Sequence, residues 1–134
     1  MAMQHTPLLM SNILDRGATV APYEEIVTLT EFGVRRQTYR ETRDRAHQLA
    51  HALAGSGIKV GDRVGTFMWN GSRHLEAYHA VAGMGAVLHT LNVRLSPKDL
   101  EYIINHAEDQ IIIVDADVLL SLIHISEPTR QFAI

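Results

Sequence analysis

The spacing of apolar residues changes several times along the chain, and each change predicts a new element. Near the N-terminus, Leu9, Ile13 and Leu14 recur at helical spacing. They predict a short amphipathic helix over residues 7–16, with these three side chains facing inward. A loop over residues 17–22, which begins with glycine and ends with proline, is expected to end that helix.

The next segment predicts a β-hairpin followed by a long helix. Two β-rich runs, Glu25–Thr30 and 34–38, flank the turn Glu31-Phe32-Gly33. Thr38 and Glu41 then have the spacing of a capping box, in which each side chain accepts a backbone N–H at a helix start. The helix is expected to end near Gly55 and Gly57, and its inward stripe is Tyr39, Thr42, Ala46, Leu49, Ala50 and Leu53.

A βαβ unit follows, because two short strand patterns flank one helical pattern. Residues 63–68 and 86–91 form the strands, and Asn70-Gly71-Ser72 is expected to cap the helix that runs to Ala82. Gly83 and Gly85 are expected to close that helix. Its expected buried residues are Leu75, Tyr78, Val81 and Ala82.

A second helix and a third parallel strand complete the predicted fold. Ser96 and Pro97 start a helix over 97–106, with Asp99 near its positive end. Its expected inward residues are Leu100, Ile103, Ile104 and Ala107. The apolar run 110–115 predicts a strand buried on both faces. The fold class is therefore α/β: the start of a doubly wound, mostly parallel sheet with an N-terminal β-hairpin. The last strand would leave an exposed apolar edge, which predicts self-association.

The C-terminal residues do not continue this pattern. The string LSLIHISEPTR, residues 120–130, resembles the translated sequence of a transposon-end adapter used in sequencing libraries. We therefore divide the chain into residues 1–119, a partial domain, and residues 120–134, a non-native tail. The alternative is an ordinary loop with a turn at Glu127-Pro128.

The amino-acid composition excludes several classes of function for this chain. At 134 residues with 46% hydrophobic content, the chain can form one globular domain. It has no cysteine, and its net charge of -3 is interspersed along the chain, which argues against nucleic acid as a partner. Neither a signal peptide nor a membrane-spanning stretch is present, so we expect a cytoplasmic protein, at most peripheral at a membrane.

The histidines and glycines are weak candidates for chemistry. His47 and His51 have the i, i+4 spacing that could share a metal ion, but no third ligand is apparent, and a solvated helix face is the commoner explanation. The pair His74 and His79, and His89 alone, are weaker still. The Gly83-Met84-Gly85 run follows a helix, whereas phosphate loops follow a strand.

Trp69 and four acidic residues each have a structural explanation beside a functional one. Trp69 lies at the carboxyl end of a predicted parallel strand, where α/β proteins often bind ligands, although packing over the sheet end is the commoner explanation. The acidic residues Glu41, Asp44, Asp99 and Glu101 are expected to be solvated ion pairs or caps.

The run from Gly61 to Asp109, GDRVGTFMWNGSRHLEAYHAVAGMGAVLHTLNVRLSPKDLEYIINHAED, resembles the opening of the adenylate-forming (AMP-binding) enzymes, specifically the bacterial medium- and long-chain fatty acyl-CoA synthetases. The resemblance extends over residues 9–119. It implies an N-terminal fragment of a ligase that uses ATP, Mg²⁺ and CoA to convert a fatty acid to acyl-AMP and then to acyl-CoA.

In that family the residues that carry the chemistry lie downstream of this segment. We therefore assign no catalytic, cofactor-binding or metal-binding residue here, and we expect this chain alone to be inactive. The alternative is a stand-alone noncatalytic α/β module that binds a ligand or a partner at its strand ends.

Overall fold

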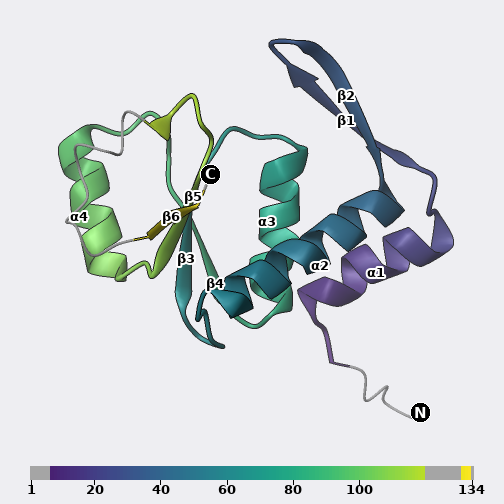
Figure 1. Ribbon diagram of the computed structural model, residues 1–134, viewed down its shortest axis with the longest axis horizontal. Helices are drawn as coiled ribbons and strands as arrows, with labels where there is room; N and C mark the ends of the chain where they lie inside the picture. Colours follow the sequence, from purple (N-terminus) through teal and green to yellow (C-terminus); the bar gives the residue numbers. More distant parts are fainter. Residues whose placement is uncertain (1–6, 120–130, 134) are drawn as a thin grey trace, which may run out of the picture.

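The computed structural model describes residues 7–119 and 131–133, and in it a parallel sheet lies between two layers of helices (Figure 1). Helices α2 and α3 cover one face of the sheet and α4 covers the other, while a β-hairpin projects from the α2 side. In chain order the elements are α1 (Met10–Val20), β1 (Glu25–Thr30), β2 (Gly33–Thr38), α2 (Tyr39–Gly55), β3 (Arg63–Phe67), α3 (Ser72–Gly83), β4 (Val87–Thr90), α4 (Pro97–Ala107), β5 (Ile111–Val114) and β6 (Gln131–Ala133).

The sheet confirms the predicted doubly wound α/β class. Its strand order is β4-β3-β5-β6, and all of its neighbouring strands are parallel. From β3 the chain passes through α3 to β4 on one side of β3, and then through α4 to β5 on the other side of β3. Because both connections are right-handed, α3 and α4 lie on opposite faces of the sheet. Separate apolar clusters lie on the two faces: Val64 and Ile111 belong to the α2/α3 side, and Phe67, Ile112 and Leu100 belong to the α4 side.

The third parallel strand does not end as an exposed edge, which corrects the expectation from sequence. Ile111, Ile112 and Ile113 pair in register with Gln131, Phe132 and Ala133 of β6. The backbone groups of β5 therefore have hydrogen-bonding neighbours on both sides. The predicted non-native tail, 120–134, lies outside the described residues apart from this strand.

Helix α1 differs from the predicted helix in both its ends and its buried face. It runs through Gly17, where a Cβ would be in ordinary van der Waals contact with the Tyr39 ring at 3.4 Å, so this glycine does not end the helix. Leu14 and Ala18 are buried, whereas Leu9 and Ile13 are exposed. Tertiary contacts explain this difference. Helix α1 packs on α2 and α3, and Leu14 there meets the small side chains of Ala46 and Ala80. The face of α1 that carries Leu9 and Ile13 is turned away from this contact.

The hairpin and α2 form as predicted. Thr38 Oγ1 accepts the Glu41 N–H while Glu41 Oε2 accepts the Thr38 N–H, so the capping box is complete. Pairing of β1 with β2 is antiparallel and runs from Glu25↔Thr38 to Thr30↔Gly33. Of the expected inward stripe of α2, Thr42, Ala46 and Leu53 are buried.

The buried face of helix α3 agrees only in part with the prediction. Val81 is buried as predicted, and Leu75 and Ala82 are partly buried. Tyr78 is exposed, while Glu76, Ala77 and Ala80 are buried. The reason is that α3 packs against α2 and the hairpin as well as the sheet, and these neighbours supply polar partners for Glu76.

The predicted Asn70-Gly71-Ser72 cap is also wrong in detail. Gly71 is the N-cap residue and has no side-chain cap. The Ser72 N–H instead donates to Thr28 Oγ1 of β1 at 3.1 Å.

Helix α4 and strand β5 confirm their sequence patterns. Ser96 Oγ accepts the Asp99 N–H, and Pro97 occupies the first turn. The helix ends at Glu108, whose φ of 55° is left-handed. All four residues of β5 are buried. None of the helices in residues 7–119 is long and apolar enough to cross a membrane.

Candidate functional site

The carboxyl ends of β3 and β5 form the strongest candidate site in the described part of the chain. These neighbouring strands are the point at which the sheet's connections diverge to opposite sides, and ligands of open α/β sheets bind at such points. The segments that follow the strands are 68–71 after β3, 91–96 after β4 and 115–119 after β5.

Trp69 lies at this edge and is held by two carboxylates. Its backbone N–H donates to Asp115 Oδ2 at 2.8 Å, and its indole Nε1–H donates to Asp117 Oδ2 at 2.8 Å. The ring is 47% exposed. The sequence placed Trp69 correctly, but nothing in the sequence pattern pointed to Asp115 and Asp117 as its partners.

His74 lies beneath this edge, on the first turns of α3. Its Nε2 is 3.0 Å from Thr66 Oγ1 of β3, and its ring is tilted against Tyr78 with 5.0 Å between ring centroids. Burial lowers the pKa of His74, and the smaller effects of Asp115 and the Trp69 backbone oppose this shift. The imidazole is therefore neutral at pH 7, and Thr66 fixes its orientation.

The residues at this sheet edge do not form a binding site for the phosphates of a nucleoside triphosphate. The three segments after the strands hold two carboxylates, Asp115 and Asp117, and Arg94 as their one basic residue. Gly71 is their one glycine, and a Cβ there would meet Thr28 at 3.2 Å, so it serves packing against the hairpin. Phosphate cradles need several free backbone N–H groups and positive charge. No step of phosphate chemistry can be assigned to these residues.

His47 and His89 have structural partners. His47 Nε2 is 3.6 Å from Asp15, which links α2 to α1. His89 Nδ1 is 2.8 Å from Asp109, whose side chain is fully buried. Within residues 7–119, no group of three or more side chains has the composition and proximity of a metal site, and His47 and His51 are not joined by a third ligand.

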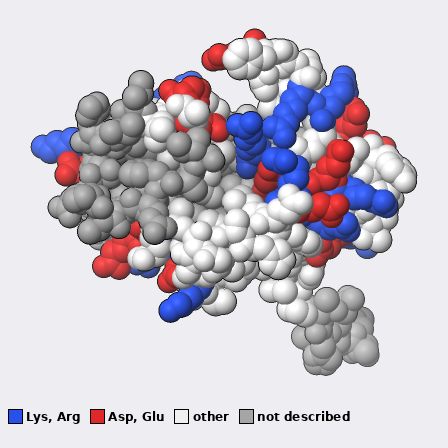
Figure 2. All heavy atoms as spheres, viewed as in Figure 1, with Lys and Arg blue, Asp and Glu red and all other residues white. Residues whose placement is uncertain are grey.

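Charged residues are interleaved over the face drawn in Figure 2. Blue and red side chains alternate over the hairpin and α2. Several form ion pairs, including Arg36 with Glu25 at 2.7 Å and Arg43 with Asp44 at 2.7 Å. The acidic residues singled out from the sequence behave accordingly, because Glu41 and Asp99 are exposed cap residues and Asp44 is an exposed ion-pair partner.

Residues 14–131 match the family described as AMP-binding enzyme. The chain belongs to the AMP-binding enzyme family. A long-chain-fatty-acid–CoA ligase of Thermus thermophilus is 48% identical to it over 118 residues, which are 87% of this chain and 22% of that ligase. A medium-chain-fatty-acid–CoA ligase of Ectopseudomonas oleovorans is 38% identical over 122 residues, 90% of this chain and 22% of that protein.

Solved AMP-binding structures share the fold. The anthranilate CoA ligase AuaEII, in complex with anthranoyl-AMP, aligns with a TM-score of 0.80 and 25% identity over 93% of this chain and 24% of that one. A fatty acyl CoA synthetase of Mycobacterium tuberculosis aligns with a TM-score of 0.79 and 24% identity, over 93% of this chain and 26% of that one. The chain thus spans about a quarter of the length of these structures.

Proposed function

We propose that this chain forms the opening part of an ATP-dependent fatty acid:CoA ligase. The observation that carries the proposal is the 48% identity to the Thermus thermophilus ligase, sustained over 87% of this chain. In the proposed reaction a fatty carboxylate attacks the α-phosphorus of ATP and releases pyrophosphate. The CoA thiol then displaces AMP from acyl-AMP to give acyl-CoA.

The proposed partners of the whole ligase are a fatty acid, ATP with Mg²⁺, and CoA. Its proposed location is the cytoplasm, with peripheral contact with membranes where the fatty acid is drawn from lipid. Mg²⁺ would neutralise phosphate charge. The described residues contribute scaffold only: β3 and β5 form the sheet centre, and the Trp69, Asp115 and Asp117 contacts fix its carboxyl edge.

A chimera tests the proposal directly. Residues 14–119 of this chain would replace the corresponding stretch of the Thermus thermophilus ligase. The chimera is expected to form acyl-CoA from a long-chain fatty acid, ATP and CoA. A folded chimera without turnover, beside an active parent ligase assayed in parallel, would contradict the proposal.

The chain alone is expected to be inactive, since its described residues hold no phosphate-binding loop. The measurement is ATP-dependent formation of acyl-CoA with medium- and long-chain fatty acids. Turnover above a protein-free control would contradict this expectation.

A further inference from the structure

Asn70 and Gly71 form an exposed Asn-Gly pair in the segment that joins β3 to α3. Both residues lie outside the flanking strand and helix, since β3 ends at Phe67 and α3 begins at Ser72. Asn70 is exposed, and the backbone of Gly71 is extended, with φ -163° and ψ -177°. Neither burial nor regular backbone hydrogen bonding therefore protects the bond between these two residues.

The groups of this pair that can react with each other have no competing partners within the described part of the chain. The Asn70 side-chain amide makes no hydrogen bond to residues 7–119 or 131–133, and the Gly71 N–H donates to none of them. The Gly71 carbonyl oxygen, by contrast, accepts the Leu75 N–H at 3.0 Å. The amide carbon of Asn70 and the nitrogen of Gly71 are thus both available for reaction.

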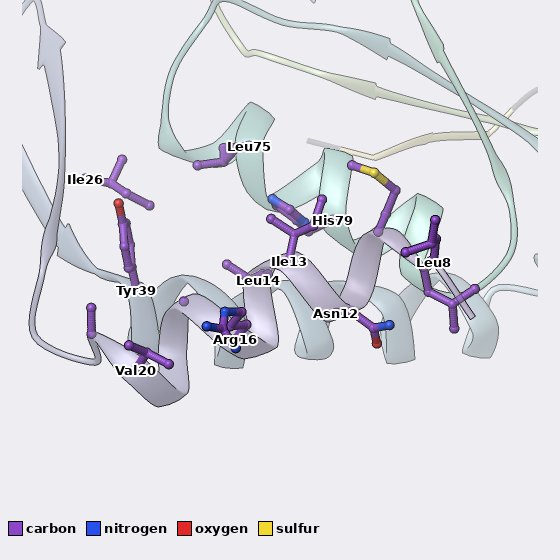
Figure 3. A pocket seen from close by; sticks show the side chains of 14 residues that line it. Leu8, Asn12, Ile13, Leu14, Arg16, Val20, Ile26, Tyr39, Leu75 and His79 are labelled. Carbon is purple, nitrogen blue, oxygen red and sulfur yellow. The ribbon is translucent and has the colours of Figure 1, made fainter. Parts of the chain in front are cut away.

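The other asparagines are held differently. Asn12 lies on α1, beside the apolar groove shown in Figure 3, and its Nδ2 donates to the Pro7 carbonyl oxygen at 2.8 Å. The Asn92 side chain accepts the Arg94 N–H at 2.9 Å, and Asn105 lies within α4. None of these asparagines is followed by glycine, because the next residues are Ile13, Val93 and His106.

An Asn-Gly pair can rearrange without an enzyme. The Gly71 nitrogen loses its proton and attacks the side-chain carbonyl carbon of Asn70, the new C–N bond closes a five-membered succinimide ring, and ammonia leaves. Water then opens the ring at either carbonyl, which gives aspartate or isoaspartate. The net reaction consumes one water and releases one ammonia, and it needs no oxidant or reductant. Glycine favours the attack because no Cβ crowds the nitrogen, whereas β-branched residues such as Val93 crowd theirs.

We propose that Asn70 is a site of spontaneous deamidation in this chain, with aspartate and isoaspartate as its products. The proposal stands on the exposure and the free groups of residues 70–71, and it is independent of the proposed function. Asparagine is among the thermally labile residues, and Asn70 is the asparagine of this chain that combines an exposed side chain with a following glycine.

Deamidation at Asn70 alters a segment that is fixed at both ends. Upstream, Trp69 donates hydrogen bonds to Asp115 and Asp117, and downstream the Ser72 N–H donates to Thr28 Oγ1 at 3.1 Å. Both products add a carboxylate next to Trp69, and isoaspartate also lengthens the main chain by one carbon atom between the two fixed points. Because Trp69 is the one tryptophan of the chain, its fluorescence reports the change.

The test follows the masses of two tryptic peptides while the whole chain is incubated at mildly alkaline pH. Peptide 64–73 contains Asn70 and peptide 74–94 contains Asn92, so each peptide reports on a single asparagine. Conversion of the amide to an acid adds about 1 Da. We expect peptide 64–73 to gain this mass at least about tenfold faster than peptide 74–94, because Val93 crowds the nitrogen that attacks Asn92.

Asn70→Gln is the matched variant, because its longer side chain keeps the amide but has to close a six-membered ring. The mass gain in peptide 64–73 should be lost in this variant. The fluorescence of Trp69 should change in step with the mass gain in the parent chain and stay constant in the variant. Co-elution with synthetic peptides that carry aspartate or isoaspartate at position 70 identifies the products.

Equal rates in the two tryptic peptides would overturn the proposal. A rate in the folded chain more than about a hundredfold below that of the free synthetic peptide 64–73 would also overturn it, since the fold would then protect Asn70. Conversion with unchanged fluorescence would support the deamidation site and contradict the effect on Trp69.

Discussion

Glu76 shows how a single buried charge can connect three elements. Its Oε1 accepts from Gln37 Nε2 of β2 at 2.8 Å and from Arg45 Nε of α2 at 2.7 Å. Gln37 Nε2 also donates to Thr42 at 2.9 Å. The hydrogen bond to Glu76 raises the pKa of Arg45, so the guanidinium stays charged.

Removal of this carboxylate should destabilise the chain. Glu76→Ala removes one of the two acceptors of the buried Gln37 amide and leaves Arg45 without its ion-pair partner. Because Arg45 is partly solvated, we expect a loss of about 2–3 kcal/mol in the free energy of unfolding, below the full cost of breaking a buried pair. Urea unfolding measures it. Asp44→Ala, which breaks the exposed pair with Arg43, is the control and should cost less than about 1 kcal/mol; similar losses for both would contradict this role of Glu76.

The two partly buried histidines predict a pH dependence of stability. Burial lowers the pKa values of His74 and His79 from their ordinary 6.5 in the folded chain. The unfolded chain therefore binds more protons below about pH 6.5, and stability must fall as the pH falls through the folded pKa values. The urea midpoint should be lower at pH 5.5 than at pH 7.5.

The variant His74→Gln/His79→Gln should reduce that difference, since it removes both buried imidazoles. His51→Gln changes an exposed histidine of α2 and should leave the difference unchanged. An unaltered pH response in the double variant would show that other groups cause it.

At the scale of elements, local signals determined where α2 and α4 start, and tertiary contacts determined which faces the helices bury. The Thr38 and Ser96 caps were predictable, because a cap depends on residues a few positions apart. The buried faces of α1 and α3 were not fully predictable, because α1 packs on two helices and α3 packs on helices as well as on the sheet. A glutamate such as Glu76 is assigned to solvent from sequence, since its partners are 31 and 39 residues away.

At the candidate site, too, local sequence predicts the position of a residue but not its distant partners. Trp69 could be placed at a strand end from local pattern alone. Its link to Asp117 could not, because it depends on β5 returning beside β3 rather than beside β4.

Two glycines in different elements should respond to alanine with opposite signs. In β3, a Cβ at Gly65 would lie 3.2 Å from Asp109 Oδ2 and from Ile112, inside the closed core. Gly65→Ala should therefore destabilise by about 1–3 kcal/mol. At the end of α2, a Cβ at Gly55 meets nothing within 4 Å, so Gly55→Ala should stabilise by about 0.5 kcal/mol through lower unfolded-state entropy. Thermal unfolding of both variants tests this; destabilisation by both would refute the packing argument.

At the scale of the whole molecule, the pairing of β6 with β5 predicts an effect on association. Strand β6 covers β5, whose residues are apolar and buried. A chain ending at residue 119 would expose this edge, and exposed apolar edges pair with other chains. Light scattering should therefore show a larger mass for residues 1–119 than for residues 1–134 at equal concentration. Equal masses would mean that the pairing of β6 does not protect the sheet.

The strand order also determines when each strand can gain its neighbours during synthesis. β3 gains β4 as its first neighbour when residue 90 has emerged, but its second neighbour, β5, begins only at Ile111. At typical rates of about 5–20 residues per second, the intervening stretch takes on the order of 1–4 s to synthesise. During that interval the most apolar part of the sheet has one open side, while the hairpin, whose strands are joined by a short turn, can already have formed. The unpaired side of β3 is thus most prone to non-native strand pairing just before residues 111–114 leave the ribosome.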